Sequence, residues 1–242
     1  MRYGIFSDVH ANLEALERVL GAYKSESIDK YICVGDIVGY AANPQECIDK
    51  VRSLCMVSVA GNHDWASIGF TPLDYFNPLA KEAVLWTSRK LNEHARACLE
   101  SLKLIYTNED LTVVHGTLDS PGDFNYMNDG YAARQTFAIL ERDICFVGHT
   151  HVAGFFIREE NGGVSYRQDV HINIEKRKKY IVNTGSVGQP RDGNPSSAYC
   201  IYDTAEKELY IKRIDYDIQS ARDKIKQAGL PQFLGDRLLL GR

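Results

Sequence analysis

The first sixty residues alternate short apolar runs with segments of helical periodicity, and this alternation limits the possible folds more than any other feature. Apolar runs at residues 3–6, 31–34 and 56–59 have the length of buried strands. Between the first two runs, leucines recur at helical spacing from Asn12 onward. Between the second and third, Asn43 and Pro44 have the order of an N-cap and a first helical residue. This β-α-β-α-β order implies parallel strands joined by right-handed crossovers, and therefore an α/β domain.

The rest of the chain changes from helix to closely spaced strands. Asn77 and Pro78 predict the start of a helical stretch that reaches about Leu102 and breaks near Asn92. Strands are then expected at residues 111–114, 144–147, 152–157, 180–182, 198–202 and 208–214, and they predict a second, antiparallel or mixed sheet. Helical spacing returns at residues 218–240. The chain has no repeat and no long linker, so we expect residues 1–242 to form a single domain.

The composition excludes several classes of protein. Hydrophobic residues make up 44% and charged residues 25% of the chain, as in ordinary globular domains. The net charge of −4 argues against a general nucleic-acid or membrane binder, because proteins that follow phosphates carry a basic excess. No run reaches the roughly 18 apolar residues that a membrane-spanning helix needs.

The N-terminus and the cysteines are typical of a cytoplasmic protein. An acidic residue, Asp8, comes too early for a signal peptide. The six cysteines are scattered without a C-x-x-C pair, and several lie inside apolar runs. This pattern is typical of reduced, buried thiols, so we expect neither disulfides nor cysteine ligands to a metal.

Side chains that can bind metals follow the predicted strands. In FVGHTH, His149 and His151 come directly after an apolar run, and residues two apart in extended chain point to the same side. Alone, such a pair would be interpreted as surface histidines. The segments FSDVH, CVGD, VAGNHD and VVHG supply partners at other strand ends: Asp8, His10, Asp36, Asn62, His63, Asp64 and His115. Since ligands bind beyond the carboxyl ends of strands in α/β sheets, we expect these side chains to meet.

The donor types indicate the kind of metal. Carboxylate oxygen, imidazole nitrogen and amide oxygen suit ions such as Mn, Fe, Zn or Co. The donors are too many for one four-coordinate ion, so we expect two ions that share a carboxylate. The remaining histidines, His94 in a helical segment and His171 in a polar stretch, are interpreted as surface or packing residues.

These segments resemble a known family. FSDVHAN, CVGDIVGY, VAGNHD, VVHG and VGHTH are similar, in order and spacing, to the five signature blocks of the calcineurin-like metallophosphoesterases. NTGSVGQPRDG and the ending YDIQSARDKIKQAGLP resemble the compact prokaryotic branch of that superfamily. The resemblance implies a four-layer α/β/β/α sandwich of two facing mixed sheets, with a dinuclear metal site at their shared edge.

The resemblance also implies a role for each site residue. One metal would be held by Asp8, His10 and His151, a second by Asn62, His115 and His149, and Asp36 would bridge them. His63 would be the catalytic histidine that binds no metal, oriented by Asp64. Two places depart from the family pattern and concern the substrate rim. Thr184 stands where a proline is usual, and Ala41-Ala42 replaces a common Gly-Pro.

The expected chemistry is hydrolysis of phosphate mono- or diesters. Two cations about 3.5 to 4 Å apart bind the phosphoryl oxygens and lower the pKa of a bridging water from 15.7 toward about 7, so that hydroxide is available for direct attack. His63 would donate a proton to the leaving oxygen, with Asp64 favouring its imidazolium form. One alternative is a weakly active metal-binding scaffold for protein interaction, and another is a nuclease, which would need a basic groove.

The sequence leaves the substrate open. Arg191, in the QPRDG turn, is a candidate substrate contact because a guanidinium can grip phosphoryl oxygens. The Gly-rich loop at residues 116–131 carries Phe124, Tyr126 and Tyr131. It is interpreted either as a solvated loop or as a rim that stacks a base. A small phosphorylated substrate such as a nucleotide and a phosphoprotein both fit.

Overall fold

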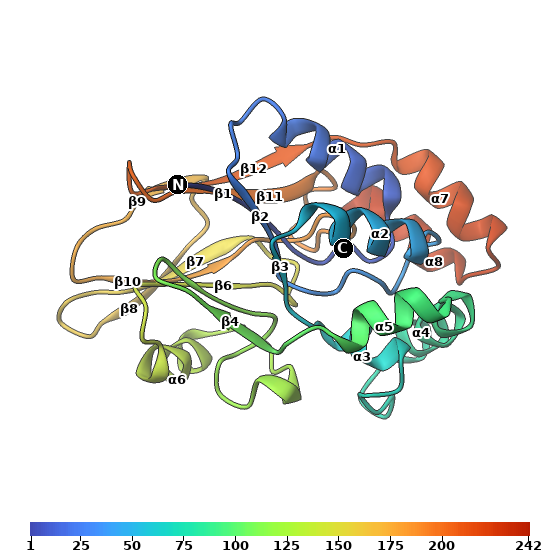
Figure 1. Ribbon diagram of the computed structural model, residues 1–242, viewed down its shortest axis with the longest axis horizontal. Coiled ribbons are helices and arrows are strands. Elements are labelled where there is room, and N and C mark those ends of the chain that lie inside the picture. The colour runs from blue at the N-terminus through green and yellow to red at the C-terminus, as the bar shows by residue number, and fades with distance from the viewer.

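In the computed structural model, residues 1–242 form two six-stranded sheets with helices on their outer faces (Figure 1). The first sheet has the order β3-β2-β1-β11-β12-β9 and contains β1 (Arg2–Phe6), β2 (Lys30–Cys33), β3 (Val57–Ser58), β9 (His171–Asn173), β11 (Ser197–Asp203) and β12 (Glu208–Ile214). The second has the order β4-β5-β6-β10-β7-β8 and contains β4 (Ile105–Thr107), β5 (Thr112–Val114), β6 (Ile144–Val147), β7 (Gly154–Arg158), β8 (Val164–Arg167) and β10 (Lys179–Asn183).

Both sheets are mixed. Strands β1, β2 and β3 are parallel in the first sheet, and β5, β6 and β10 are parallel in the second. The remaining neighbours pair antiparallel. Because neighbouring parallel strands run in the same direction, the carboxyl ends of β1, β2 and β3 lie at one edge of the first sheet, and those of β5, β6 and β10 lie at one edge of the second.

Three hydrophobic cores separate four layers. In β11, Cys200 and Tyr202 point into the core between the two sheets, whereas Tyr199 and Ile201 point to the core beneath the helices of the first sheet. Residues of β6 alternate in the same way between the central core and a third core under the helix on the second sheet. This period of two is what a strand buried on both faces requires. The expected four-layer α/β/β/α sandwich is confirmed.

The helices cover the two outer faces unequally (Figure 1). Four helices pack on the first sheet: α1 (Leu13–Tyr23), α2 (Pro44–Leu54), α7 (Ile218–Gln227) and α8 (Gln232–Asp236). The second sheet is covered by α6 (Gly130–Ile139). Three further helices follow β3 and two short 3₁₀ helices lie elsewhere: α3 (Asn62–Ser67), α4 (Pro78–Lys90), α5 (Glu93–Glu100), η1 (Pro121–Asp123) and η2 (Arg237–Leu240). No helix has both the length and the apolar character needed to cross a membrane.

Asparagine caps begin three of these helices, at the predicted starts near Asn12 and Asn77 and after the predicted break near Asn92. The side chains of Asn12, Asn77 and Asn92 accept hydrogen bonds from backbone N–H groups in the first turns of α1, α4 and α5. Asn43, the residue predicted as an N-cap, stands directly before α2, but its side chain donates to Glu46 at 2.8 Å and makes no cap bond. Helix α1 is also tied to its sheet by Tyr23, whose hydroxyl donates to the backbone oxygens of Ile5 in β1 and Cys200 in β11.

The later strands do not all join a second sheet, which corrects the expectation from their spacing. Strands β11 and β12, together with β9, return to the first sheet, where β11 pairs antiparallel with β1. Helix α6 and strands β4, β8 and β9 are additional elements that the periodicity did not predict. A strand's partner is chosen by long-range packing, which spacing along the chain does not encode.

Candidate metal centre

Loops that leave the parallel strands of both sheets meet at one shared edge. Asp8 follows β1 and donates its backbone N–H to Gly35 O, just beyond β2, at 3.0 Å. Its carboxylate accepts from the backbone N–H of His149, beyond β6 of the other sheet, at 3.1 Å. Asn183, at the end of β10, binds Gly148 O through its side chain at 2.8 Å. These hydrogen bonds to backbone groups connect the loops at the shared edge without any bound ligand.

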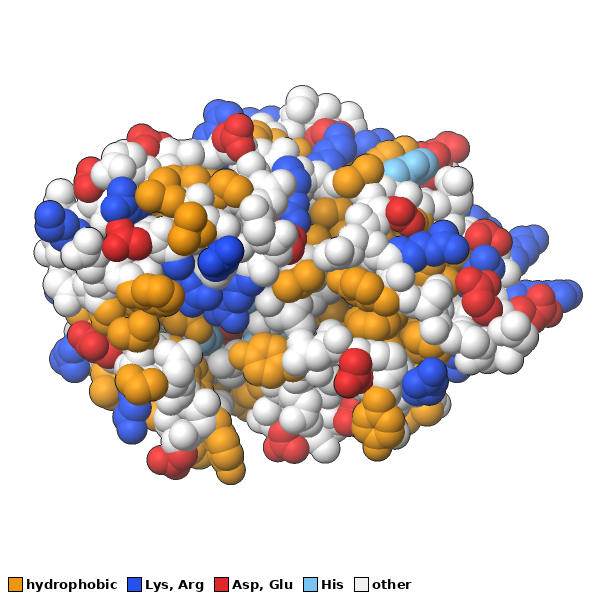
Figure 2. Space-filling model, turned by 180° about the vertical axis from the view of Figure 1, so that it is seen from behind, with side chains coloured by type: hydrophobic (Ala, Val, Ile, Leu, Met, Phe, Trp, Pro, Cys, Tyr) orange, Lys and Arg blue, Asp and Glu red, His pale blue; other side chains and the backbone are white.

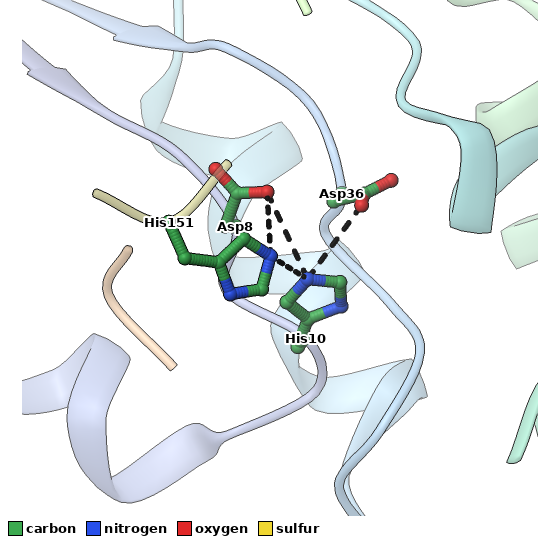
Figure 3. A group of neighbouring side chains, drawn as sticks. All are labelled: Asp8, His10, Asp36 and His151. Atoms are coloured by element: carbon green, nitrogen blue, oxygen red, sulfur yellow. Dashed lines mark hydrogen bonds and ion pairs between the residues drawn. The ribbon is translucent and has the colours of Figure 1, made fainter. Parts of the chain in front are cut away.

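The predicted carboxylates and histidines gather there in two buried groups. The first contains Asp8, His10, Asp36 and His151, and the second contains Asp36, His115 and His149; within each, one donor atom per residue lies within 4.8 Å of the others. Figure 3 shows the first group, with the side chains pointing at a common space. Asp36 belongs to both groups, and this division coincides with the two ligand sets that the family resemblance implies.

Two unprotonated imidazole nitrogens face each other inside the first group. His10 Nε2 and His151 Nε2 are 3.0 Å apart (Figure 3). Each Nδ1 lies on a backbone carbonyl, Val38 O at 3.2 Å and Gln189 O at 2.6 Å. A carbonyl can only accept, so each Nδ1 carries the proton and each Nε2 presents a lone pair. Two lone pairs at this distance repel unless a cation lies between or beside them.

The pKa shifts of His10 and His151 agree with this assignment of unprotonated Nε2 atoms. Burial and the neighbouring His151 lower the pKa of His10 well below its usual value. Burial, with Arg191, also lowers the pKa of His151. Both rings are therefore neutral at physiological pH, which is the form that binds a metal.

The second group, Asp36, His115 and His149, also contains buried atoms that a cation would stabilise. His115 Nδ1 lies 2.8 Å from Val34 O, so Nε2 is the free nitrogen, and it points at Asp36 Oδ2 at 3.3 Å. Burial opposes a charge on this ring, but Asp36 and Asp8 outweigh it and raise the pKa of His115 to about 9. Asp36 Oδ2, His115 Nε2 and Asn62 Oδ1 are all buried without a hydrogen-bond partner. Buried polar atoms are rarely left in this state. The oxygens of Asp36 and Asn62 can only accept, so a cation suits them: a proton on His115 in the metal-free chain, or a bound metal ion that replaces that proton.

Several of these residues have a strained backbone. Asp8, His10, Asp36, His149 and His151 have φ between 50° and 66°, the left-handed region that non-glycine residues seldom adopt. Each such residue costs on the order of 1–2 kcal/mol. Strain of this kind is held in place by its surroundings and clusters at functional sites.

Glycines allow the two sheets to approach at this edge. A Cβ on Gly61 would overlap the carboxylate of Asp36, and a Cβ on Gly148 would overlap Ser7 Oγ and crowd Asp8. The glycines that precede Asn62 and His149 in sequence are therefore needed for close packing behind the carboxylates.

His63 and Asp64 are brought to the site but not in the predicted relationship. Asp64 Oδ1 accepts from the backbone N–H groups of Ile37 and Val38, and Oδ2 accepts from that of Gly61. His63 Nδ1 is buried without a partner. The expectation that Asp64 orients His63 is thus wrong, because a residue in the first turn of α3 turns its carboxylate to nearby N–H groups.

Charge around His63 also differs from the expectation. Burial lowers the pKa of His63 to about 4, with a further lowering by Arg191, although Asp36 acts in the opposite direction. The free ring is therefore neutral. Burial and Asp36 raise the pKa of Asp64 to about 7.

Arg191 lies beside the first group. Its Nη2 donates to Tyr40 OH at 3.2 Å and to Gln189 Oε1 at 3.0 Å, and its guanidinium lies over the Tyr40 ring at 5.6 Å. It forms no ion pair, and the carboxylate of its neighbour Asp192 pairs with Arg213 instead. A half-buried guanidinium without an acidic partner can bind an anion.

A cavity of about 690 Å³ opens next to the histidines. Its lining includes Asn62, His63 and His149, and of the aromatic residues singled out in sequence it includes Phe124 and Tyr126 but not Tyr131. Tyr40, Tyr75 and Phe76 also line it, and the sequence reasoning missed them. The signal available was the aromatic-rich segment between α3 and α4. The two departures from the family pattern, Thr184 and Ala41-Ala42, are not part of the lining.

Comparison with known proteins gives consistent relatives. Residues 1–207 match the model of the calcineurin-like phosphoesterase superfamily domain. A protein of Methanocaldococcus jannaschii is 40% identical over 98% of this chain and 97% of its own length. The crystal structure of a metallophosphoesterase from Sphaerobacter thermophilus is 40% identical, covers 100% of this chain and 99% of that one, and has a TM-score of 0.90. A Pyrococcus horikoshii structure at 17% identity and a TM-score of 0.79, covering 100% and 98% of the two chains, shares the fold.

Proposed function

The chain belongs to the calcineurin-like phosphoesterase superfamily, and on that premise we propose that it is a dinuclear-metal-dependent phosphoesterase. It would hydrolyse phosphate mono- or diesters by direct attack of water, without a covalent protein intermediate. The observation that carries the proposal is the pair of facing lone pairs on His10 and His151, beside the unpartnered oxygen of Asp36. Scattered cysteines support a cytoplasmic location.

The proposed ligand sets follow the two groups of donors. Asp8, His10 and His151 would hold one ion, Asn62, His115 and His149 the other, and Asp36 both. This nitrogen and oxygen donor set suits Mn, Fe, Zn or a mixture of them. When bound, such ions would offset the charge of the phosphoryl oxygens and make hydroxide available near neutral pH.

The chain's own residues would complete the reaction. His63 lines the cavity and is placed to donate a proton to the leaving oxygen. Its ring is neutral in the free protein, and the negative charge of a bound phosphoryl group would raise its pKa. Arg191 would bind a non-bridging phosphoryl oxygen, and Asp64 would hold the loop that carries Asp36.

The test is metal-dependent turnover. Protein stripped with a chelator should lose hydrolysis of p-nitrophenyl phosphate or its diester, and Mn, Fe or Zn should restore it. Elemental analysis should show about two equivalents of metal per chain. The variant His94→Ala is a matched control, because His94 lies on α5 outside the donor groups. Full activity with one equivalent or less would contradict the dinuclear proposal.

A further inference from the structure

The cavity beside the donor groups has an unusual density of aromatic rings. Besides His63 and His149 it is lined by Tyr40, Tyr75, Phe76, Phe124 and Tyr126. Figure 2 shows this side of the molecule, with histidine visible in a hollow near the centre and hydrophobic side chains beside it. Cavities of roughly 300–1,000 Å³ are typical of small-molecule sites, and this one, at about 690 Å³, lies within that range.

The aromatic rings lie on two sides of the cavity, one beside His63 and the other beside the candidate metal ligands His115 and His149. On one wall, His63 lies between Tyr40, at 4.5 Å between ring centroids, and Phe76, at 5.0 Å. On the other, Tyr126 stacks on His149 at 3.8 Å with 18° between the planes. Phe124 lies edge-on to His115 at 6.1 Å. Any group attached to a phosphate at the donor groups would therefore enter between aromatic surfaces.

Two of the lining rings are exposed to water, one almost entirely and one by about half. Tyr75 is 93% exposed and Tyr126 is 49% exposed. Tyrosine usually buries most of its ring, since a large apolar area gains free energy when it leaves water. Exposed rings at the mouth of a cavity are available to stack on a ligand.

The charge of the lining limits what that ligand can be. Asp123 is the one carboxylate among the lining residues, and there is no lysine or arginine. A second phosphate or an acidic peptide would find no cation among the lining residues, and Arg191, which contacts the lining residue Tyr40, is already assigned to the phosphate at the donor groups. Thr71, Asn77 and Asn125 supply neutral hydrogen-bonding groups at the same surface. A flat, uncharged group with polar edges matches this lining.

We propose that the substrate is a phosphate ester of a nucleoside-sized molecule whose planar base stacks in this cavity. The proposal rests on the phosphoesterase function proposed above. Stacking on aromatic side chains tolerates every base, because each has a π face, so the class is nucleotides rather than one nucleotide. The cavity is the source of selectivity, and the donor groups act on the phosphate.

The test compares two substrates that differ in the base. Kinetics with AMP and with glycerol phosphate should show kcat/KM at least about tenfold higher for AMP. Tyr75→Ala should raise KM for AMP by about fivefold to tenfold and leave that for glycerol phosphate unchanged. Tyr126→Ala, whose ring also stacks on His149, should raise KM for AMP by more than that for glycerol phosphate. Tyr131→Ala is the matched control, because Tyr131 is 69% exposed and lies outside the cavity. Metal content should be unchanged in all three.

A binding measurement keeps the proposal testable without turnover. Trp65 lies 5.9 Å from Phe124, so adenosine should change its fluorescence in a saturable way and ribose should not. Equal efficiency for AMP, glycerol phosphate and a phosphoserine peptide, or an AMP KM unchanged in both tyrosine variants, would overturn the nucleotide class and leave the phosphoesterase function intact. Adenosine binding without hydrolysis of any ester would support the cavity assignment and overturn the phosphoesterase function. Absence of adenosine binding would overturn the cavity assignment.

Discussion

The backbone N–H of His63 donates a hydrogen bond to Oδ1 of Asp36 at 2.9 Å. The hydrogen bond links the proposed bridging carboxylate, in the loop after β2, to the residue proposed as proton donor, in the first turn of α3. One oxygen of Asp36 is used in this contact, and the other, Oδ2, is the buried atom without a partner. The two oxygens can therefore be tested separately.

Asp36→Asn should remove metal without removing this contact. The amide oxygen can still accept from His63 N–H, but the side chain loses the negative charge that two cations would share. We expect less than one equivalent of metal per chain and a loss of turnover of at least about 100-fold. Elemental analysis and p-nitrophenyl phosphate kinetics measure both. Asp49→Asn on α2, outside both donor groups, is the control, and two retained equivalents with normal turnover would refute the bridging role.

His63→Asn should separate proton donation from metal binding. Metal content should stay at the wild-type value, because the ring belongs to neither donor group. Hydrolysis of alkyl phosphate esters should fall by about 10²- to 10⁴-fold, since their leaving oxygen needs a proton. Hydrolysis of p-nitrophenyl esters should change little. Equal slowing of both ester types, or loss of a metal, would assign His63 to positioning or ligation instead.

Asp64→Asn should act through the loop and not through His63. The amide keeps only one accepting oxygen, so either Gly61 N–H or the N–H groups of Ile37 and Val38 lose their acceptor, and a buried donor without a partner costs about 1–3 kcal/mol. Urea unfolding should show this loss, together with weaker metal binding. The ratio of alkyl to p-nitrophenyl ester hydrolysis should remain that of the wild type. A ratio like that of His63→Asn would restore the orienting role that the hydrogen bonds argue against.

Arg191→Ala should weaken the binding of phosphate. A guanidinium without an acidic partner can bind phosphoryl oxygens bidentately, and its loss should raise KM by about tenfold while kcat changes less. Inhibition by inorganic phosphate should weaken in parallel. Arg167→Ala, at an exposed position on β8, is the control. The contact is disproved by an unchanged KM for every substrate that the enzyme cleaves.

Tyr23→Phe should lower stability and leave the site alone. The hydroxyl donates to Ile5 O and Cys200 O in a fully buried position. Its removal leaves two backbone oxygens without that partner and should cost about 1–3 kcal/mol in the free energy of unfolding. Urea denaturation measures the change, and metal content serves as the control. A stability equal to the wild type would show that these two bonds contribute little.

Much of this protein is determined by local sequence. Apolar runs of strand length, asparagine caps before helices and polar residues after each strand depend on neighbours a few residues apart, so they can be recognised without the fold. His149 and His151 were predicted to face one space as residues of extended chain. Both reach the shared edge, but with left-handed backbone and in separate donor groups that share Asp36. The family resemblance added the pairing of those donors into two sets.

Only the tertiary structure decided which strands pair, which groups Asp64 binds and which aromatic rings share a cavity. Strand β11 pairs with β1 from the opposite end of the chain, and β12 joins the same sheet through β11, because packing between layers selects the pairing. The carboxylate of Asp64 binds backbone N–H groups of the loop after β2 and of Gly61, and it makes no hydrogen bond to His63. The reason is that Asp64 lies in the first turn of α3, where these N–H groups are close. The aromatic cavity joins Tyr40, Phe76 and Tyr126 from three loops that share no periodicity. Contacts between residues so far apart depend on how the loops fold over the sheet edge, and local patterns carry no record of that geometry.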